Sequence, residues 1–529
     1  MGSKTQSTRL RNVAITSFVL LVFYVFLLHP TDQNLDSSPS TTAEFNDFPG
    51  AGYGSGSAKQ KPPTRQELLP ELLNNRFMNS QQCANTFPGL TKEIDDVVAK
   101  GPFALTRTSE LGPLIARIKD GKLYILQSGR RTDFSDEMLQ QRAASLHQIA
   151  AALLTAPHPS EIPSDTVFAL NYRDEPTEST LSYSRPAAAV DPKPSRGSYF
   201  PIPHFSFWSW PLPFIGSFTR AAKAIQDLEE GNGGPNNVPP LSWRDKDPRV
   251  VWRGTAHFNN VRAGRMRQEL LRTAAGKPWS DIAALQWTTT SGVNNASNAL
   301  AIEDFCRYRY VVHTEGITYS GRFQFHQLCA SVVLTPPLAW MQHLTHLVRP
   351  VFSYDLPSLA AAEDDESGSS SSANTKTMAA AIERKLRPPK EYSNGVHEKL
   401  SLAPYPAPWV QQAWPRSYTM NHDHHQDRKD STAGDDEQGP NIVFVAPDWS
   451  DLESVVAWLE AHPRAAEGIA RRQRALFHGR GYFSPAAEMC YWRAALRGWA
   501  RTVRYEDGLL AALGDGVPWE EFSLKEVHR

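Results

Sequence analysis

The alternation of hydrophobic and polar positions predicts strands and helices that follow one another along the chain. Runs of β-branched and aromatic residues predict buried strands at 166–172 (TVFALNY), 250–255 (VVWRGT), 311–312, 331–335 and 442–445. Apolar residues at helical spacing predict helices at 137–154, 322–329, 452–461, 467–478 and 484–503, the first of them capped near Ser135. Alternating strands and helices are typical of an α/β protein.

The amino-terminal part of the chain has the pattern of a membrane-anchored protein. Three basic residues precede an uncharged apolar run over 13–28, and the first charge after it is Asp32. Because basic residues favour the cytosolic side, we expect residues 1–12 to be a cytosolic tail and 13–28 to be a transmembrane signal anchor. A cleaved signal peptide is the alternative, although a histidine and a proline follow the run where a cleavage site needs small residues. Residues 29–75 are predicted to be a disordered stem.

The remainder of the chain is predicted to form two domains and a final helix. A glycine- and proline-rich linker marks the boundary between residues 76–235 and residues 236–483. Two stretches in the second domain, near 361–378 and 420–440, are rich in serine, histidine and acidic residues and are predicted to be disordered insertions. Residues 484–529 are expected to carry a helix that returns to the first domain.

Length and charge limit the classes of protein to which the chain can belong. At 529 residues it is long for one core, which agrees with two domains and extensions. The net charge is −1 and no long basic face stands out, so a nucleic-acid-binding protein is disfavoured. Forty prolines and fourteen tryptophans indicate a protein rich in loops and aromatic rings, as sugar-binding proteins often are.

The stretch 308–336 has the pattern of an anion-binding corner. A strand leads to a turn at Gly316, a helix is expected to begin near Ser320 and Gly321, and a second strand follows. Ligands of such sheets lie beyond the carboxyl ends of the strands, where a helix N-terminus offers free N–H groups. Arg322 adds a planar guanidinium suited to a diphosphate. Many α/β strands end in a glycine turn without binding a ligand, so this spacing alone leaves both interpretations open.

Four short motifs resemble the signature of glycosyltransferase family 90. They are the segments 306–310 (CRYRY), 315–316 (EG), 320–323 (SGRF) and 328–331 (LCAS), and the likeness extends with gaps from about Arg76 to about Trp499. The family holds protein O-glucosyltransferases and xylosyltransferases and the fungal capsule-associated xylosyltransferases. The resemblance implies the glycosyltransferase B fold, two Rossmann-like domains that face each other across a cleft. The first domain would then bind the acceptor and the second the nucleotide sugar.

The resemblance also implies a set of residues that contact the nucleotide sugar. One group surrounds the predicted corner and comprises Glu315, Gly316, Ser320, Gly321, Arg322 and Phe323. The other belongs to a Trp-Arg-Gly segment and the helix after it, and comprises Arg253, Gly254, Thr255 and Arg262. No metal ion or other cofactor is expected, because the arginines and the helix N-terminus would stabilise the diphosphate.

A candidate for the catalytic base follows the strand over 166–172. The segment 171–174 (NYRD) is similar to the catalytic N-x-R-D segment of the family, in which the aspartate is the base, so Asp174 is the catalytic candidate. From the residues alone Asp174 could equally cap the turn, and Glu175 is the neighbour to test against it. Arg173 beside it and Arg142 on the predicted helix are candidate substrate contacts.

An aromatic stretch over 200–213 supplies the other acceptor-side candidates. It is similar to a Pro-x-x-x-Phe-Trp loop of the family, with Pro203, Phe207 and Trp208 at the matching positions. Such rings can lie against a sugar, but an aromatic plug between the domains explains the same residues equally well.

The four cysteines lack the spacing of a zinc site. Their number leaves three possible pairings or four free thiols. The resemblance implies the pairs Cys306–Cys329 and Cys83–Cys490, which an oxidising lumen would support. Asn295 begins a single N-glycosylation sequon.

The sequence therefore predicts an inverting glycosyltransferase that moves xylose or glucose from a UDP-sugar to a hydroxyl of a glycan or protein. We expect a single-pass type II protein of the Golgi or ER membrane, with its catalytic region in the lumen, UDP-xylose or UDP-glucose as donor and no nucleic-acid partner. Two alternatives stay open. One is a metal-dependent glycosyltransferase that uses the D-x-D triplet of Asp245 and Asp247, and the other is a non-catalytic membrane-anchored carbohydrate-binding protein.

Overall fold

A computed structural model describes most of the chain beyond the predicted stem. The described residues are 70–105, 113–129, 135–187, 199–232, 239–258, 265–290, 293–357, 359 and 439–527. The predicted cytosolic tail and signal anchor, residues 29–69 of the stem, and nearly all of the two predicted insertions lie outside these ranges. Within them, no helix combines the length and the hydrophobicity that a membrane span requires.

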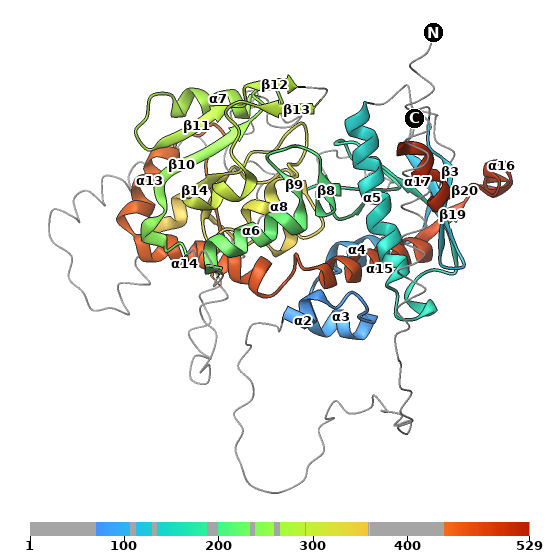
Figure 1. Ribbon diagram of the computed structural model, residues 1–529. Coiled ribbons are helices and arrows are strands. Elements are labelled where there is room, and N and C mark those ends of the chain that lie inside the picture. Colours follow the sequence, from blue (N-terminus) through green and yellow to red (C-terminus); the bar gives the residue numbers. More distant parts are fainter. Residues whose placement is uncertain are drawn as a thin grey trace, which may run out of the picture. The chain divides into compact units, whose positions relative to one another are not determined.

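The second half of the chain is built on a six-stranded parallel sheet (Figure 1). Among the described residues, its strand order is β11-β10-β14-β15-β18-β17. The strands are β10 (Asp247–Gly254), β11 (Ser280–Ala284), β14 (Tyr308–Val312), β15 (Val332–Thr335), β17 (Pro350–Phe352) and β18 (Ile442–Phe444). Every neighbouring pair is parallel. The β-branched runs predicted to be strands at 250–255, 311–312, 331–335 and 442–445 all lie in this sheet.

Helices cover both faces of the parallel sheet. Successive side chains of a strand point to opposite faces, so Val250 packs with α7 (Met266–Ala274), α13 (Leu452–Ala461) and α14 (Pro463–Arg474). Val251 packs on the other face with α6 (Phe218–Glu230). A sheet buried on both faces needs continuous apolar strands, which explains why these segments lack a polar alternation.

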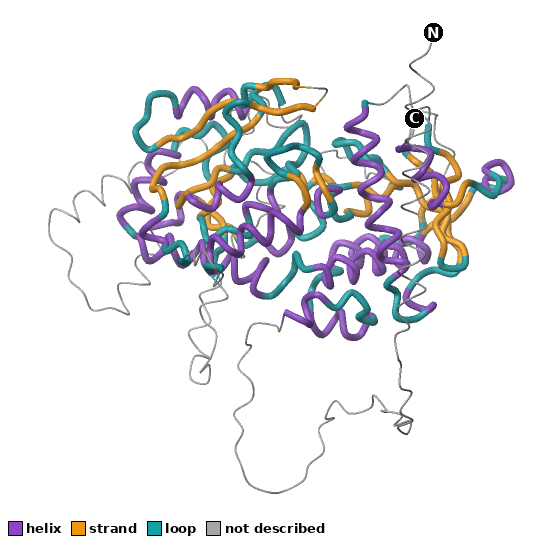
Figure 2. Tube along the Cα trace, viewed as in Figure 1, coloured by secondary structure: helices purple, strands orange, loops and turns teal. Residues whose placement is uncertain are grey.

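A second six-stranded sheet, in which only part of the pairing is parallel, takes five strands from the first half of the chain and one, β20, from near its carboxyl end. Its strand order is β20-β3-β2-β4-β5-β7. In Figure 2 the strands of this mixed sheet lie to the right of those of the parallel sheet. The strands are β2 (Leu114–Lys119), β3 (Lys122–Gln127), β4 (Asp165–Leu170), β5 (Thr180–Ser182), β7 (Tyr199–Pro201) and β20 (Val517–Pro518). β4, β5 and β7 are parallel, whereas β2 is antiparallel to both β3 and β4.

The antiparallel part departs from the Rossmann pattern expected for this half of the chain. Its physical origin is a tight turn at Asp120 and Gly121, both of which have positive φ angles, 50° and 75°. A turn of this length forces the strands on either side of it into an antiparallel hairpin, since a parallel crossover needs a dozen residues or more.

Two long helices, one from the first half of the chain and one from near its end, pack in the core of the mixed sheet. α5 (Asp136–Leu154) begins as predicted at Ser135, whose side chain accepts a hydrogen bond from the Met138 N–H. α15 (Pro485–Thr502) begins at Ser484 in the same manner and packs against α5 and α4 (Lys92–Ala99). Trp492 and Trp499 of α15 are fully buried in the core beneath the mixed sheet.

The remaining elements are short. The helices are α2 (Pro70–Asn74), α3 (Ser80–Thr86), α8 (Phe323–His326), α16 (Leu509–Leu513) and α17 (Trp519–Val527). The two-stranded pairs are β1 (Phe103–Leu105) with β19 (Val503–Tyr505), β6 (Arg185–Pro186) with β16 (Trp340–Met341), β8 (Ser209–Trp210) with β9 (Gly216–Ser217), and β12 (Trp287–Thr290) with β13 (Val293–Ala296). Through β6 and β16, residues of the two halves share a ladder.

Two predicted helices differ from the structure in length or position. The helix expected over 322–329 is the four-residue α8, after which backbone bonds of i to i+3 type lead into β15. The helix expected over 467–478 is α14, which begins four residues earlier because Pro463 occupies its first turn, followed by a π-helical turn over Ala475–Gly479.

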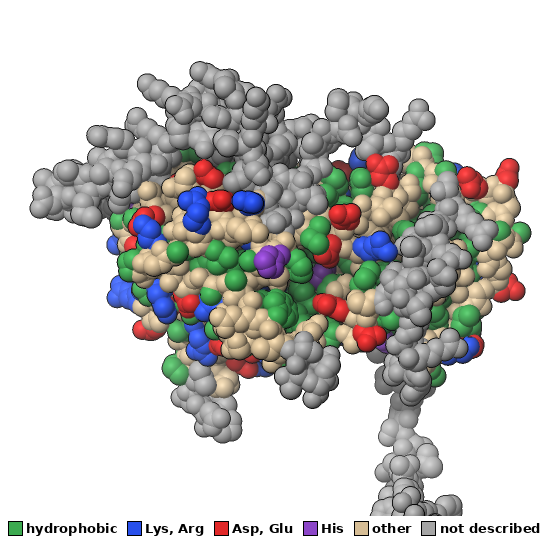
Figure 3. Space-filling model, turned by 90° about the horizontal axis from the view of Figure 1, so that it is seen from above, with side chains coloured by type: hydrophobic (Ala, Val, Ile, Leu, Met, Phe, Trp, Pro, Cys, Tyr) green, Lys and Arg blue, Asp and Glu red, His purple; other side chains and the backbone are tan. Residues whose placement is uncertain are grey.

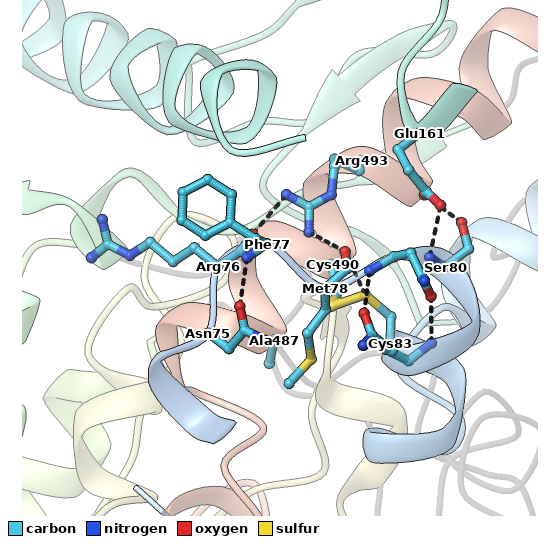
Figure 4. The surroundings of a disulfide bond; sticks show 12 residues. Asn75, Arg76, Phe77, Met78, Ser80, Cys83, Glu161, Ala487, Cys490 and Arg493 are labelled. Carbon is cyan, nitrogen blue, oxygen red and sulfur yellow. Dashed lines mark hydrogen bonds between the residues drawn. A yellow bond between two sulfur atoms is a disulfide. The ribbon is translucent and has the colours of Figure 1, made fainter. Parts of the chain in front are cut away.

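Two disulfides join the pairs that the family resemblance implies. Cys83 of α3 is bonded to Cys490 of α15, and Cys306 is bonded to Cys329. Beside the first pair, Arg493 donates hydrogen bonds to the backbone oxygens of Arg76 (3.1 Å) and Met78 (2.9 Å) (Figure 4). The start of the described chain is thereby fixed to the helix near its end.

Candidate active site

A cavity of about 820 Å³ lies where the loops after the strands of both sheets meet. Its walls come from α5, the loop after β4, the aromatic stretch over 200–215, the loops after β10 and β14, and the hairpin of β12 and β13. The carboxyl ends of parallel strands are where α/β proteins bind ligands. On the face seen in Figure 3, acidic and basic side chains are interspersed over the described surface, so neither charge dominates there.

Asp174 lines this cavity and is held by a tight turn after β4. The Asn171 side-chain amide donates to the Glu175 carbonyl (2.6 Å), and its oxygen accepts from the Arg173 N–H (3.1 Å). These bonds close the turn and present Asp174 to the cavity. The first and fourth residues of the NYRD motif therefore have different roles, since one shapes the turn and the other supplies a carboxylate.

The surroundings of Asp174 raise the pKa of its carboxyl group above the ordinary range for aspartate. The main cause is loss of hydration where the cavity walls surround the carboxyl group, although the residue as a whole is exposed. The negative charges of Glu137 and Glu175 add to this effect, and the cation of Arg267 opposes it. A carboxylate with a raised pKa is a stronger base than an ordinary aspartate.

Two arginines line the same cavity without a carboxylate partner among the described residues. Arg267 is buried and donates to the backbone oxygens of Glu315 (3.1 Å) and Thr255 (2.9 Å). Arg322 is partly buried and donates to the backbone oxygen of Arg253. Neither guanidinium forms an ion pair with a described carboxylate, although the charge of Asp174 acts on Arg267 from a distance; this is unusual for enclosed arginines and favours an anionic ligand.

Burial lowers the pKa of both guanidinium groups. Burial, and then the charge of Arg322, lower the pKa of Arg267 to about 9, while Asp174 raises it. Burial lowers the pKa of Arg322 to about 10. Both groups still carry their protons at neutral pH. The cavity therefore combines these two cations, and the exposed Arg173, with the carboxylate of raised pKa and with Glu137 and Glu175.

A direct hydrogen bond connects the turn of Asp174 to the loop after β14. The hydroxyl of Thr318 donates to the backbone carbonyl of Asp174 at 2.7 Å, and Thr318 is fully buried. The same loop carries Gly316, Ser320, Gly321 and Arg322, all of which line the cavity. The carboxylate and the arginine side of the cavity are thus held in one framework.

Gly321 and Gly254 have no room for a side chain. A Cβ atom on Gly321 would lie 2.3 Å from Cε1 of His204, and one on Gly254 would lie 2.4 Å from a ring carbon of Trp252. Both glycines line the cavity, but close packing against neighbouring rings is what requires them.

Three of the residues predicted to contact the nucleotide sugar lie outside the cavity wall. Arg253 is paired with Asp281 at 2.6 Å, Glu315 accepts hydrogen bonds from the backbone of Ala339 and Trp340, and Phe323 is buried against His313. They position the loops that form the site. Thr255 lines the cavity as predicted, and Arg262 lies outside the described residues.

The other residues predicted to bind substrate are divided in a similar way. Arg173 lines the cavity, whereas Arg142 is buried behind it, with its guanidinium 5.6 Å from the centroid of the Tyr172 ring. Pro203 and Phe207 are core residues, and Trp208 is exposed and stacks on His147. The aromatic stretch does reach the cavity, but through other side chains, namely His204, Phe205, Trp210, Leu212, Phe214 and Ile215.

Several cavity residues are absent from the sequence-based prediction, and Arg267 is the most consequential. It lies two residues after Arg265, on the face of α7 turned toward the sheet, and an arginine on the apolar face of a predicted helix is the signal that was available. Tyr319 lies within the stretch 308–336 and His204 within the aromatic stretch 200–213, but the predicted site contained other residues of these two stretches. Glu137 lines the cavity from the first turn of α5.

The D-x-D aspartates lie away from the cavity and have local partners. Asp245 accepts a hydrogen bond from Ser242 (2.5 Å), and Asp247 is paired with Arg249 (2.6 Å). In the part of the chain that the structure describes, no three His, Cys, Asp or Glu side chains are grouped as a metal ion would require. Asn295 of the sequon lies in β13 and is partly exposed.

A parallel sheet with a cavity beyond its strand ends, lined by arginines and a carboxylate, is typical of an α/β protein that binds a ligand there. The model of one protein family, described as Glycosyl transferase family 90, matches residues 91–359, just over half of the 529 residues. The chain belongs to this family, and it is a glycosyltransferase. The match is narrower than the likeness expected from Arg76 to Trp499, and it contains both Asp174 and Arg322. A comparison with curated proteins gives no match.

Proposed function

We propose that the protein is an inverting glycosyltransferase that moves xylose or glucose from a UDP-sugar to a hydroxyl of a glycan or protein. The observation that carries the proposal is that Asp174 and the two arginines, Arg267 and Arg322, line one cavity. A base for the acceptor and cations for the leaving diphosphate must lie on opposite sides of a single sugar, and one cavity provides both.

The proposed architecture is the glycosyltransferase B arrangement. The acceptor would bind on the side of the mixed sheet and the nucleotide on the side of the parallel sheet. In favour of it, Arg267 and Arg322 follow strands of the parallel sheet, whereas Asp174 follows β4 of the other sheet. A cavity of about 820 Å³ is within the size range of pockets that bind ligands as large as a nucleotide sugar.

In the proposed reaction the Asp174 carboxylate accepts the proton of an acceptor hydroxyl while that oxygen attacks the anomeric carbon of the sugar. The bond from the anomeric carbon to the diphosphate oxygen breaks on the opposite face, so the configuration inverts and UDP leaves. General-base assistance is worth about 10²- to 10⁴-fold in rate. The two guanidinium groups stabilise the negative charge that grows on the diphosphate as the bond breaks.

The four-residue length of α8 bears on how the diphosphate is held. A helix dipole accumulates over several turns, so one turn contributes little to anion binding. In this proposal the charge stabilisation comes mainly from the two arginines and the backbone N–H groups of the loop that contains Ser320 and Gly321. No metal ion has a part in it.

A secretory location agrees with the two disulfides and with the partly exposed sequon at Asn295. We propose a type II protein of the Golgi or ER membrane whose catalytic region lies in the lumen, anchored by residues 13–28. Loss of mass on treatment with an N-glycosidase, absent from an Asn295→Gln variant, is the measurement that checks lumenal exposure.

A donor screen tests the proposed activity. The full-length protein is incubated with UDP-xylose, UDP-glucose and other UDP-sugars, and release of UDP and transfer to glycan and peptide acceptors are measured. Transfer from UDP-xylose or UDP-glucose, lost in an Asp174→Asn variant that still binds UDP, is the expected result. Binding of UDP without turnover of any donor would favour a non-catalytic carbohydrate-binding protein.

A further inference from the structure

His204 is a buried histidine in the cavity wall with one ring nitrogen already engaged. Its Nδ1 accepts a hydrogen bond from the backbone N–H of Ser206 (3.2 Å) and lies 2.7 Å from the Ser206 hydroxyl. Burial lowers the pKa of His204 well below its usual range, so the ring is neutral. Because Nδ1 is an acceptor, the single ring proton resides on Nε2, which forms no hydrogen bond with another described residue.

Tyr319 is a second buried polar side chain of the cavity wall. The side chain is 6% exposed, and its hydroxyl has no hydrogen-bond partner among the described residues. Burial, followed by the charge of Asp174, raises the pKa of Tyr319 well above its usual range, so the phenol keeps its proton. An unsatisfied buried hydroxyl reduces stability, and a hydrogen bond to a ligand in the cavity would offset this cost.

The two side chains are neighbours, and they lie between the proposed reaction partners. Their ring centroids are 5.3 Å apart in an edge-to-face arrangement. His204 lies against Gly321, next to Arg322, while Tyr319 follows Thr318, which is bonded to the backbone of Asp174. Both side chains therefore line the cavity beside the segments that carry Arg322 and Asp174.

We propose that Tyr319 and His204 form a sugar-binding pair, in which the phenolic O–H and the Nε2–H donate hydrogen bonds to hydroxyl groups of the transferred sugar. The inference rests on the proposed function, since it concerns the sugar of the UDP donor. Two neutral donors of fixed protonation suit sugar hydroxyls, which accept hydrogen bonds and carry no charge. The pair is expected to select and orient the sugar without contributing to UDP binding.

Tyr319→Phe is the sharper test, because the two roles predict different changes in stability. A structural role of the hydroxyl predicts a lower melting temperature, whereas a binding role predicts an equal or higher one. If the hydroxyl binds sugar, kcat/KM for the UDP-sugar falls by about 3- to 30-fold, while the melting temperature stays equal or rises because an unsatisfied buried group has been removed. The affinity for UDP alone, measured by calorimetry, stays within about twofold. Unchanged kcat/KM would overturn the role of Tyr319.

His204 is tested with two substitutions and a matched control. His204→Phe removes the donor and keeps an aromatic ring, whereas His204→Gln keeps an N–H donor, so the loss in kcat/KM should be larger for Phe than for Gln. His343→Gln replaces another buried histidine of lowered pKa that does not line the cavity, and it should leave kcat/KM near the wild-type value. Equal losses in all three variants would show a packing effect and overturn the proposal.

Donor analogues distinguish this inference from the activity on which it depends. In the wild-type enzyme, UDP-sugars that lack one sugar hydroxyl should be poorer donors, and the deoxy position contacted by Tyr319 should cost nothing further in Tyr319→Phe. A wild-type enzyme that transfers no sugar refutes the proposed function. A wild-type enzyme that transfers sugar, with deoxy penalties identical in every variant, refutes only the sugar-binding pair.

The pH profile separates sugar binding from assistance to the base. If Tyr319 instead donated to the Asp174 carboxylate, Tyr319→Phe would raise the pKa on the acidic side of the kcat/KM profile. If His204 were itself the base, His204→Gln would abolish that acidic limb. The proposal requires that both variants keep the wild-type limb at reduced height.

Discussion

At the scale of single residues, the two enclosed arginines of the cavity form no ion pair with a described carboxylate. Arg267 and Arg322 give their hydrogen bonds to backbone oxygens, and Asp174 is raised in pKa by burial and by neighbouring carboxylates. Each of these arrangements costs folding free energy, and proteins retain such costs chiefly where a ligand or a reaction uses them.

The first prediction concerns Asp174. Asp174→Asn should reduce turnover by at least about a hundredfold, because the base for the acceptor hydroxyl is lost. Since the folded state raises the pKa of Asp174, the ionised carboxylate destabilises the fold above the pKa of the unfolded chain, and the neutral amide should be at least as stable. Steady-state kinetics and thermal unfolding check the two parts.

Glu175→Gln is the matched control, because Glu175 is the adjacent carboxylate and lines the same cavity. It should keep most of the activity. A Glu175 variant that is as inactive as Asp174→Asn, or an active Asp174→Asn, would transfer the role of base away from Asp174.

The second prediction is a pH effect. Activity should be lost as pH falls through the raised pKa of Asp174, since only the carboxylate accepts a proton. Glu137 raises that pKa, so Glu137→Gln should move the acidic limb of the kcat/KM profile to lower pH. A limb that stays in place or moves to higher pH would show that Asp174 is not the titrating group.

The third prediction concerns the diphosphate. Arg267→Ala and Arg322→Ala should each weaken UDP binding by roughly tenfold to a hundredfold, the usual range for a lost hydrogen bond to a charged group. Arg272→Ala is the control, because Arg272 lies on the same helix as Arg267 but is exposed and paired with Glu269. Calorimetric titration with UDP checks all three, and unchanged affinity in both cavity variants would contradict the phosphate role.

At the scale of elements, the parallel sheet could be predicted from sequence more fully than the mixed one. Strands such as β14 and β15 consist of apolar β-branched residues bounded by turns, and burial on both faces requires that pattern. The β2–β3 hairpin escaped prediction, because Arg117 and Lys119 interrupt β2 while the turn that pairs it depends on backbone angles at Asp120 and Gly121.

Site residues could be predicted from sequence where a short motif marks them, and not where their role depends on partners distant in the chain. Asp174 and Arg322 lie in short motifs that follow strands, so their placement at one cavity was within reach of the sequence. Whether an arginine faces a cavity or a carboxylate depends on distant partners, such as Asp281 for Arg253, and this is why Arg253 was assigned to the ligand and Arg267 was missed.

The fourth prediction concerns the disulfide between α3 and α15. Cys83 and Cys490 close a loop of 407 residues, whereas Cys306 and Cys329 close one of 23. Constraint of the unfolded chain grows with the logarithm of loop length, so replacing the first pair with serines should reduce the free energy of unfolding by ~2.5 kcal/mol more than replacing the second. Denaturant unfolding of the two double variants checks this, and equal losses would contradict it.

At the scale of the whole molecule, both sheets contribute to one cavity, so neither half is expected to be active alone. The arginines come from the part built on the parallel sheet, and the carboxylate comes from the other part. The ladder between β6 and β16 and the hydrogen bond from Thr318 to Asp174 join the two parts near the cavity.

The fifth prediction concerns metal dependence, which involves the whole site. Transfer should continue in the presence of EDTA, because Arg267 and Arg322 supply the positive charge that a divalent ion supplies in metal-dependent enzymes. The measurement is donor turnover with and without chelator. Activity that is lost with EDTA and restored by Mg²⁺ or Mn²⁺ would favour the metal-dependent alternative and return attention to Asp245 and Asp247.

The bond between the Thr318 hydroxyl and the Asp174 main chain has a consequence for the order of events in a catalytic cycle. While it persists, the segment that encloses a spent nucleotide and the turn that carries the carboxylate can shift only together. If the protein acts as we propose, opening to release UDP would also withdraw the carboxylate, and binding of a fresh donor would restore it. Under the proposed function, the position of the catalytic carboxylate would then depend on whether a nucleotide is bound.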